Sequence, residues 1–219
     1  MIDFFKSILE FVLHIDEHLM VMISDYGNYV YAIMFLIVFV ETGLIVMPFL
    51  PGDSLLFAAG AIAAANNNEG LNVFVLIPLL ILAALCGDNV NYFIGRFFSD
   101  QIKKRERILF FKREYITRTE AFYEKYGRQA IIMARFVPIV RTVAPFVAGA
   151  SNMPYRRYIT FCILGALLWV IGITLLGYTC GGFEIVKNNF ELVVFGIIGV
   201  SLLPIIIGVL KAKFGTKKA

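Results

Sequence analysis

Four charged residues stand out because they lie in stretches of the chain that are otherwise almost free of charge. Glu41 and Asp53 are acids, and Arg135 and Arg141 are bases six residues apart on either side of Pro138. A charge inside a bilayer costs about 2.5–3.5 kcal/mol on insertion scales, so such residues pair with one another or face a water-filled cavity. Their types and spacing indicate either a structural ion-pair network or a site that binds a ligand.

The two arginines favour an anion as that ligand. Arginine is always charged, and its planar guanidinium binds a phosphate through two parallel hydrogen bonds. The two acids suggest a proton, because a carboxylate desolvated in a membrane is protonated more readily than one in water. Asp53 has a second interpretation, since Pro51-Gly52-Asp53-Ser54 is also typical of a helix N-cap. An acid combined with a phosphate clamp is consistent with proton-coupled movement of a phosphorylated lipid.

A third polar group follows a helical spacing. Asp88, Tyr92 and Arg96 recur every four residues, so a helix would place them on one face. Such a stripe either packs one helix into a bundle or supports the charged residues described above.

Histidine and cysteine give no comparable signal. His14 and His18 have a helical metal-ligand spacing, but no third ligand is evident, so neither a metal nor another cofactor is predicted. The cysteines lie in or beside apolar segments without a C-x-x-C pair and are expected to be small buried residues; they are Cys86, Cys162 and Cys180. No zinc-protease, P-loop or G-x-S-x-G motif occurs, so the chain is not expected to be an enzyme.

The composition places these charges in a membrane. Hydrophobic residues make up 59% of the chain and charged residues only 16%, whereas soluble domains typically carry about 25% charged residues. The mean hydropathy of +0.79 indicates the same. We therefore expect an all-α membrane protein.

Three apolar segments have the length of a spanning helix. A span needs about 20 residues, and residues 73–98, 158–182 and 190–210 qualify. Residues 54–65 form a helix of only roughly 18 Å, which is too short for a hydrocarbon core about 30 Å thick.

Two further apolar segments, 29–65 and 129–150, are interrupted by helix breakers. The breakers are Pro48, Pro51, Gly52, Pro138 and Pro145. Both segments therefore read as re-entrant hairpins, which are tolerated in a membrane only where protein or a watery cavity satisfies their backbone.

The two halves of the chain repeat this order. Residues 1–98 are predicted to form an amphipathic helix at 4–23, the hairpin 29–65 and the span 73–98. After a basic amphipathic linker at 99–128, expected to be helical over 102–126, residues 129–219 repeat the hairpin and the span and add a last span and a basic tail. Glu41-Thr42 and Arg141-Thr142 are 100 residues apart and would occupy equivalent points. One span in each repeat implies inverted topology, as in many secondary transporters.

Several motifs along the chain resemble the DedA family of SNARE-associated, VTT-domain membrane proteins. They are FVETG at 39–43, FLPGDSLL at 49–56, GD at 87–88 with Tyr92 and Gly95-Arg96, ARFVPIVRT at 134–142, and AG at 148–149. The resemblance covers nearly the whole chain and implies a bacterial inner-membrane protein that maintains the envelope and the proton motive force.

The resemblance also implies roles for individual residues. Family members move undecaprenyl phosphate or phospholipids, with critical acids that match Glu41 and Asp53 and critical arginines that match Arg135 and Arg141. The remaining motif residues would support them; these are Asp88, Tyr92, Arg96, Pro51, Gly52, Pro138 and Gly149.

The function expected from the sequence is a proton-linked lipid translocase whose partners are a phosphorylated lipid and protons, with no role for nucleic acid. Three alternatives stay open, namely a proton-coupled ion antiporter, a non-transporting factor for membrane-protein assembly or envelope maintenance, and an intramembrane lipid phosphatase. A homo-oligomer also stays open.

The distribution of positive charge predicts the orientation of the chain. Residues 99–128 hold 9 of the 20 Lys and Arg residues, and loop 66–72 holds none. The positive-inside rule therefore places Lys104 and Lys217 in the cytoplasm and Asn67 outside. Single cysteines at these positions, in a chain lacking its native cysteines, should be labelled from outside in intact cells only at 67. External labelling at 104 would contradict this topology.

Overall fold

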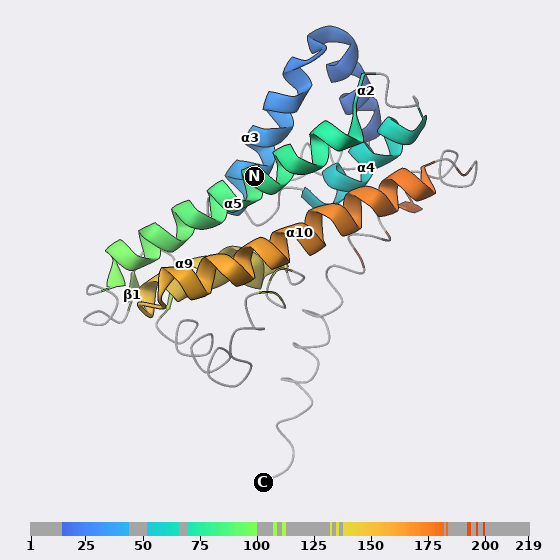
Figure 1. Ribbon diagram of the computed structural model, residues 1–219. Coiled ribbons are helices and arrows are strands. Elements are labelled where there is room, and N and C mark those ends of the chain that lie inside the picture. The colour runs from blue at the N-terminus through green and yellow to red at the C-terminus, as the bar shows by residue number, and fades with distance from the viewer. Residues whose placement is uncertain are drawn as a thin grey trace, which may run out of the picture. The chain divides into compact units, whose positions relative to one another are not determined.

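The computed structural model, drawn in Figure 1, describes residues 15–43, 52–65, 70–99 and 138–181, with the short pieces 107–108, 111–112, 132, 135, 183, 192–193, 196 and 199. Helices account for nearly all of these residues, which confirms the prediction of an all-α protein. The predicted span at 190–210 and the basic tail fall almost wholly outside the described residues, as do Lys104, Lys217 and Asn67.

Two helices are long and apolar enough, by length and composition, to cross a membrane. They are α5 (Val73–Phe97), with 25 residues, and α10 (Tyr155–Cys180), with 26. At about 1.5 Å per residue each exceeds a hydrocarbon core of about 30 Å. Helices therefore occupy the predicted segments 73–98 and 158–182, although α10 begins three residues earlier than predicted.

The helices of the predicted hairpins are shorter. They are α3 (Tyr29–Gly43), α4 (Gly52–Ala65) and α9 (Pro138–Ala150). Pro138 is the first residue of α9, as a predicted break requires, because proline is tolerated where no intrahelical N–H is needed. Pro145 does not break the helix as predicted but lies inside α9. The re-entrant path itself stays a prediction, since residues 44–51 lie outside the described part.

The amphipathic segments agree with prediction in one case and differ in the other. Helix α2 (Ile15–Tyr26) occupies part of the predicted N-terminal helix. The helix predicted over 102–126 is wrong at residues 107–112, because β1 (Arg107–Ile108) and β2 (Phe111–Lys112) pair antiparallel, with Ile108 opposite Phe111.

The chain divides into two compact units, which are described separately. Unit 1 comprises residues 1–30, 51–74 and 173–219, and unit 2 comprises residues 31–50 and 75–172. In unit 1, α2 contacts α4, whose residues Ser54 to Ala63 are all buried. Because α4 is apolar on every side, it needs protein around it rather than along one face only.

A glycine crossing joins α9 to the end of α5 in unit 2 (Figure 1). A Cβ atom on Gly149 would overlap the carbonyl oxygen of Tyr92 and come within 2.8 Å of the backbone nitrogen of Arg96. A Cβ atom on Gly95 would overlap the carbonyl oxygen of Phe146. The two backbones touch here because both helices present glycine.

The same crossing recurs in unit 1 between α4 and the end of α10. A Cβ atom on Gly60 would overlap the carbonyl oxygen of Thr174 and come within 3.0 Å of the backbone nitrogen of Tyr178. A Cβ atom on Gly177 would overlap the carbonyl oxygen of Phe57. In both units a Phe-x-x-Gly segment of a short helix meets a glycine of a long helix, so the packing repeats as well as the order of elements.

This repeated crossing corrects one expectation about equivalent residues. When Phe57-x-x-Gly60 is matched to Phe146-x-x-Gly149, Arg141 corresponds to Gly52 at the start of α4. Glu41 instead lies near the end of α3, so the two charged residues do not occupy equivalent points. A constant sequence offset is misleading here because the second hairpin is shorter than the first.

The crossings predict a clear effect of adding one methyl group. Gly60→Ala and Gly149→Ala should each destabilise the protein by about 1–3 kcal/mol, because a backbone carbonyl must move to admit the methyl group. Gly172→Ala on α10 is the matched control, since among the described residues nothing lies within 4 Å of its added Cβ. It should be neutral or stabilising, because alanine favours a helix. Thermal unfolding in detergent measures this, and equal melting temperatures for all three variants would contradict the crossing.

Candidate functional site

The acid of the first predicted hairpin forms an ion pair in unit 2. Glu41 is fully buried near the end of α3, and its Oε1 accepts a hydrogen bond from Nη2 of Arg141 at 2.6 Å. Arg141 lies in the first turns of α9, and its side chain is only 5% exposed. The prediction that Glu41 lies beside one of the two arginines is therefore confirmed.

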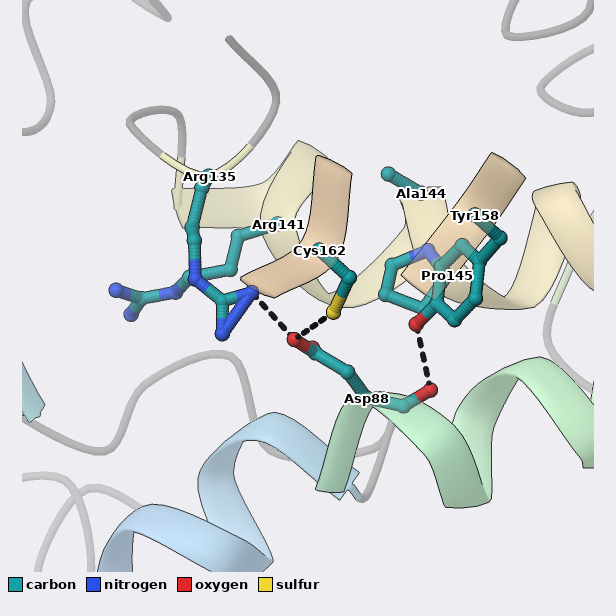
Figure 2. A pocket seen from close by; sticks show the side chains of 7 residues that line it. All are labelled: Asp88, Arg135, Arg141, Ala144, Pro145, Tyr158 and Cys162. Atoms are coloured by element: carbon teal, nitrogen blue, oxygen red, sulfur yellow. Dashed lines mark hydrogen bonds and ion pairs between the residues drawn. The ribbon is translucent and has the colours of Figure 1, made fainter. Parts of the chain in front are cut away.

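The second arginine pairs with the acid of the helical stripe. Arg135 donates from Nη1 to Oδ2 of Asp88, and both side chains are buried. Cys162 donates from its thiol to the same carboxylate oxygen at 3.1 Å, and the hydroxyl of Tyr158 donates to the backbone carbonyl of Asp88 at 2.9 Å. Figure 2 shows Arg135 pointing toward Asp88, while the guanidinium of Arg141 turns away from it.

An indole ring lies beside both arginines. The guanidinium carbon of Arg141 is 4.8 Å from the ring centroid of Trp169, and that of Arg135 is 5.6 Å from it. Trp169 is 1% exposed and is the only tryptophan of the chain. A desolvated cation over an indole face gains about 2 kcal/mol. Trp169 thus stabilises two positive charges that carboxylates alone would have to offset.

A pocket with about 220 Å³ of space not filled by atoms, its open mouth included, adjoins these groups. Its lining is drawn in Figure 2 and consists of Asp88, Arg135, Arg141, Ala144, Pro145, Tyr158 and Cys162. Within the described part of the chain, two residues of this lining, Arg135 and Asp88, have buried side-chain atoms without a hydrogen-bond partner. These atoms are Nε and Nη2 of Arg135 and Oδ1 of Asp88. Buried polar groups are normally satisfied, so these atoms indicate a place for a ligand or for water.

A buried amide links the two halves of the site. Nδ2 of Asn91 donates to the carbonyl oxygen of Thr42 at 2.6 Å and lies 3.5 Å from that of Thr142. These threonines directly follow Glu41 and Arg141 in the chain. Asn91 therefore fixes the backbone on both sides of the first ion pair.

The other residues of the predicted stripe have a different role. Tyr92 donates to the carbonyl oxygen of Met153 and accepts a hydrogen bond from Nη1 of Arg96 at 2.9 Å. Its ring stacks on Tyr158 with the centroids 4.4 Å apart. Tyr92 and Arg96 thus hold the turn after α9, and Asp88 alone of the three enters the charged site.

Two further predicted site residues belong to unit 1. Asp53 is half-buried in the first turn of α4, in unit 1, and Gly52 is the first residue of that helix. Because α4 already includes Gly52, Asp53 is inside the helix, and the N-cap interpretation is wrong. A carboxylate there still favours the positive end of the helix dipole. Pro51 lies outside the described residues.

Two contributors were not singled out from the sequence. Trp169 could have been noticed as the one indole within an apolar span, and Asn91 as an amide one turn from Asp88. No group of three or more potential metal ligands occurs among the described residues, which include His18 but not His14.

Comparison with known proteins gives matches along most of the chain. Residues 50–179 match the family model of the VTT domain. Protein DedA of Escherichia coli strain K12 is 48% identical over 217 residues, which cover 99% of each chain.

More distant relatives are also membrane proteins by name. An uncharacterized membrane protein of Mycobacterium tuberculosis H37Rv is 44% identical over 182 residues, 83% of this chain and 79% of its own. Inner membrane protein YghB of Escherichia coli strain K12 is 35% identical over 160 residues, 73% of this chain and 72% of its own. No solved structure gives a significant match.

The buried ion pair predicts an asymmetry between single and double variants. Glu41→Gln should lower stability by about 3–5 kcal/mol, because it leaves Arg141 without its buried counter-charge. Glu41→Gln combined with Arg141→Gln should be more stable than that single variant. Asp25→Asn removes an exposed carboxylate on α2 and serves as the control. Melting temperatures in detergent measure the effect, and a Glu41→Gln protein as stable as the control would contradict it.

Proposed function

This chain belongs to the DedA family of VTT-domain membrane proteins, and on that premise we propose that it translocates a phosphorylated lipid across the bacterial inner membrane in a proton-linked cycle. The lipid is undecaprenyl phosphate or a phospholipid, as the family resemblance implies. The name of one relative, an inner membrane protein, supports the location.

One observation carries the proposal, namely two buried acid–arginine pairs beside a single pocket in an apolar, membrane-spanning protein. Guanidinium groups recognise phosphate through paired hydrogen bonds, and two of them so close together suit a headgroup with several oxygens. Placing ionisable residues within a membrane costs free energy, so their presence there indicates a transport path. Between binding events the carboxylates neutralise the arginines.

The proposal assigns a role to each charged residue. Arg135 and Arg141 bind the phosphate, and Glu41 and Asp53 take up and release protons. The thiol of Cys162 and the hydroxyl of Tyr158 line the same pocket, but each donates its hydrogen bond to Asp88, which favours translocation over hydrolysis of the lipid.

The two halves are proposed to open toward opposite sides of the membrane, with the basic linker and the C-terminus in the cytoplasm. The repeated glycine crossings support two related halves, because transporters of inverted-repeat design build their site from matching elements.

The test is lipid flipping in reconstituted vesicles with a pH gradient. Labelled undecaprenyl phosphate or phosphatidylethanolamine should cross faster with the wild-type protein than in empty vesicles. Arg141→Lys keeps the charge and the pairing with Glu41 but loses the planar fork, so the flipping rate should fall at least tenfold. Arg156→Lys, an exposed arginine on α10, is the matched control and should flip at the wild-type rate.

The other outcomes separate the alternatives. Proton-dependent ion flux without flipping identifies an antiporter, release of inorganic phosphate identifies a phosphatase, and inactivity in all three assays leaves an assembly factor. Lipid flipping at the wild-type rate by both Arg141→Lys and Arg135→Lys would rule out recognition of the phosphate by the planar guanidinium groups.

A further inference from the structure

The Asp88–Arg135 pair uses one nitrogen of a guanidinium that has three. Arg135 donates from Nη1 to Asp88, whereas Nε and Nη2 have no hydrogen-bond partner within the described part of the chain. Nε–H and one N–H of Nη2 point the same way along the side of the guanidinium plane. Together they form a two-pronged donor of the kind that binds two oxygens of one phosphate or carboxylate.

Burial makes this unused edge informative. Arg135 is 5% exposed. A buried donor without an acceptor destabilises the protein by the full free energy of its desolvation. Arg135 lines the pocket, and the wall of the same pocket also contains Arg141. A second positive charge beside the free edge favours an anion over a neutral acceptor or water.

We propose that Asp88 is a positioning residue that holds Arg135 by Nη1 and so presents its Nε–Nη2 edge to an oxyanion in the pocket. This inference rests on the proposed function and adds to it the edge of the arginine that binds the phosphate and the residue that orients it. The ligand class is a tetrahedral oxyanion, either a lipid phosphate headgroup or free phosphate.

The surroundings of Asp88 explain why it can hold this position. Its Oδ2 accepts hydrogen bonds from Arg135 and from the thiol of Cys162. The hydroxyl of Tyr158 donates a hydrogen bond to the backbone carbonyl of Asp88. The carboxylate is therefore anchored to α10 as well as to Arg135. An acid anchored from two sides can orient a guanidinium that by itself would rotate about Cδ–Nε.

Binding is measured by the fluorescence of Trp169, which is the only indole and lies beside both guanidiniums. The detergent-solubilised protein is titrated with inorganic phosphate and with dodecyl phosphate, at equal ionic strength. Dodecyl phosphate binding at least tenfold tighter identifies a lipid headgroup site, and equal affinities identify a site for free phosphate. Both results are consistent with an oxyanion pocket.

Two substitutions of Asp88 separate orientation from charge. Asp88→Asn keeps an acceptor for Nη1 and removes a negative charge, so phosphate should bind at least as tightly as to the wild type. Asp88→Ala removes the acceptor, so affinity should fall at least tenfold in protein that still melts cooperatively. Asn89→Ala, whose side chain contacts Leu85 and Tyr155 instead, should leave affinity unchanged.

Equal phosphate affinity of Asp88→Ala and wild type would overturn the inference but would not contradict the proposed lipid flipping. Normal anion binding without lipid flipping would overturn only the proposed function. If Asp88→Ala does not fold, a measurement on the wild-type protein tests the inference instead. Phosphate should shift one arginine Nε–H resonance that is absent in Arg135→Lys, and no shift of that resonance would exclude binding at this edge.

Discussion

Two buried ion pairs, Glu41–Arg141 and Asp88–Arg135, set the constraint under which unit 2 is built. Each charge would be costly in an apolar environment, and each is offset by a partner from another part of the chain. Removing one partner leaves the other charge buried without a counter-charge. The resulting loss of stability is larger than the net stability that the intact pair contributes. The helices that carry these residues must therefore meet at fixed points, and the indole of Trp169 lies where both guanidiniums can face it.

The glycines and a single amide meet that requirement. Close approach of α9 to α5 needs Gly95 and Gly149, since a side chain at either position would collide with a backbone carbonyl. Asn91 then fastens the residues that follow Glu41 and Arg141. Backbone contact and hydrogen bonding suit a protein in lipid, where the hydrophobic effect drives helix association only weakly. These contacts hold the helices around the charges together with a cluster of buried residues that includes Phe146, Val147 and Tyr158.

Length and hydropathy were enough to predict α5 and α10, because a span is a property of one segment. Charges in apolar segments likewise pointed to Glu41 and Arg141. The partner of Asp88 was not predictable in this way, since helical spacing only grouped Asp88 with Tyr92 and Arg96, whereas the fold pairs it with Arg135. The predicted equivalence of Glu41 and Arg141 also failed, because a constant offset cannot detect a shorter second hairpin. Pairings between helices depend on crossing points, and these appear in the sequence only as scattered glycines.

The buried residues of charged type in the described part of unit 2 are two carboxylic acids and two arginines, so their formal charges cancel. A transmembrane voltage acts on net charge, with about 2.3 kcal/mol per elementary charge for each 100 mV. A neutral cluster does no electrical work when its surroundings rearrange. A transmembrane voltage therefore acts on this cluster as a whole only through a charge that is added to it, such as a proton on one of its acids or an anion in the pocket.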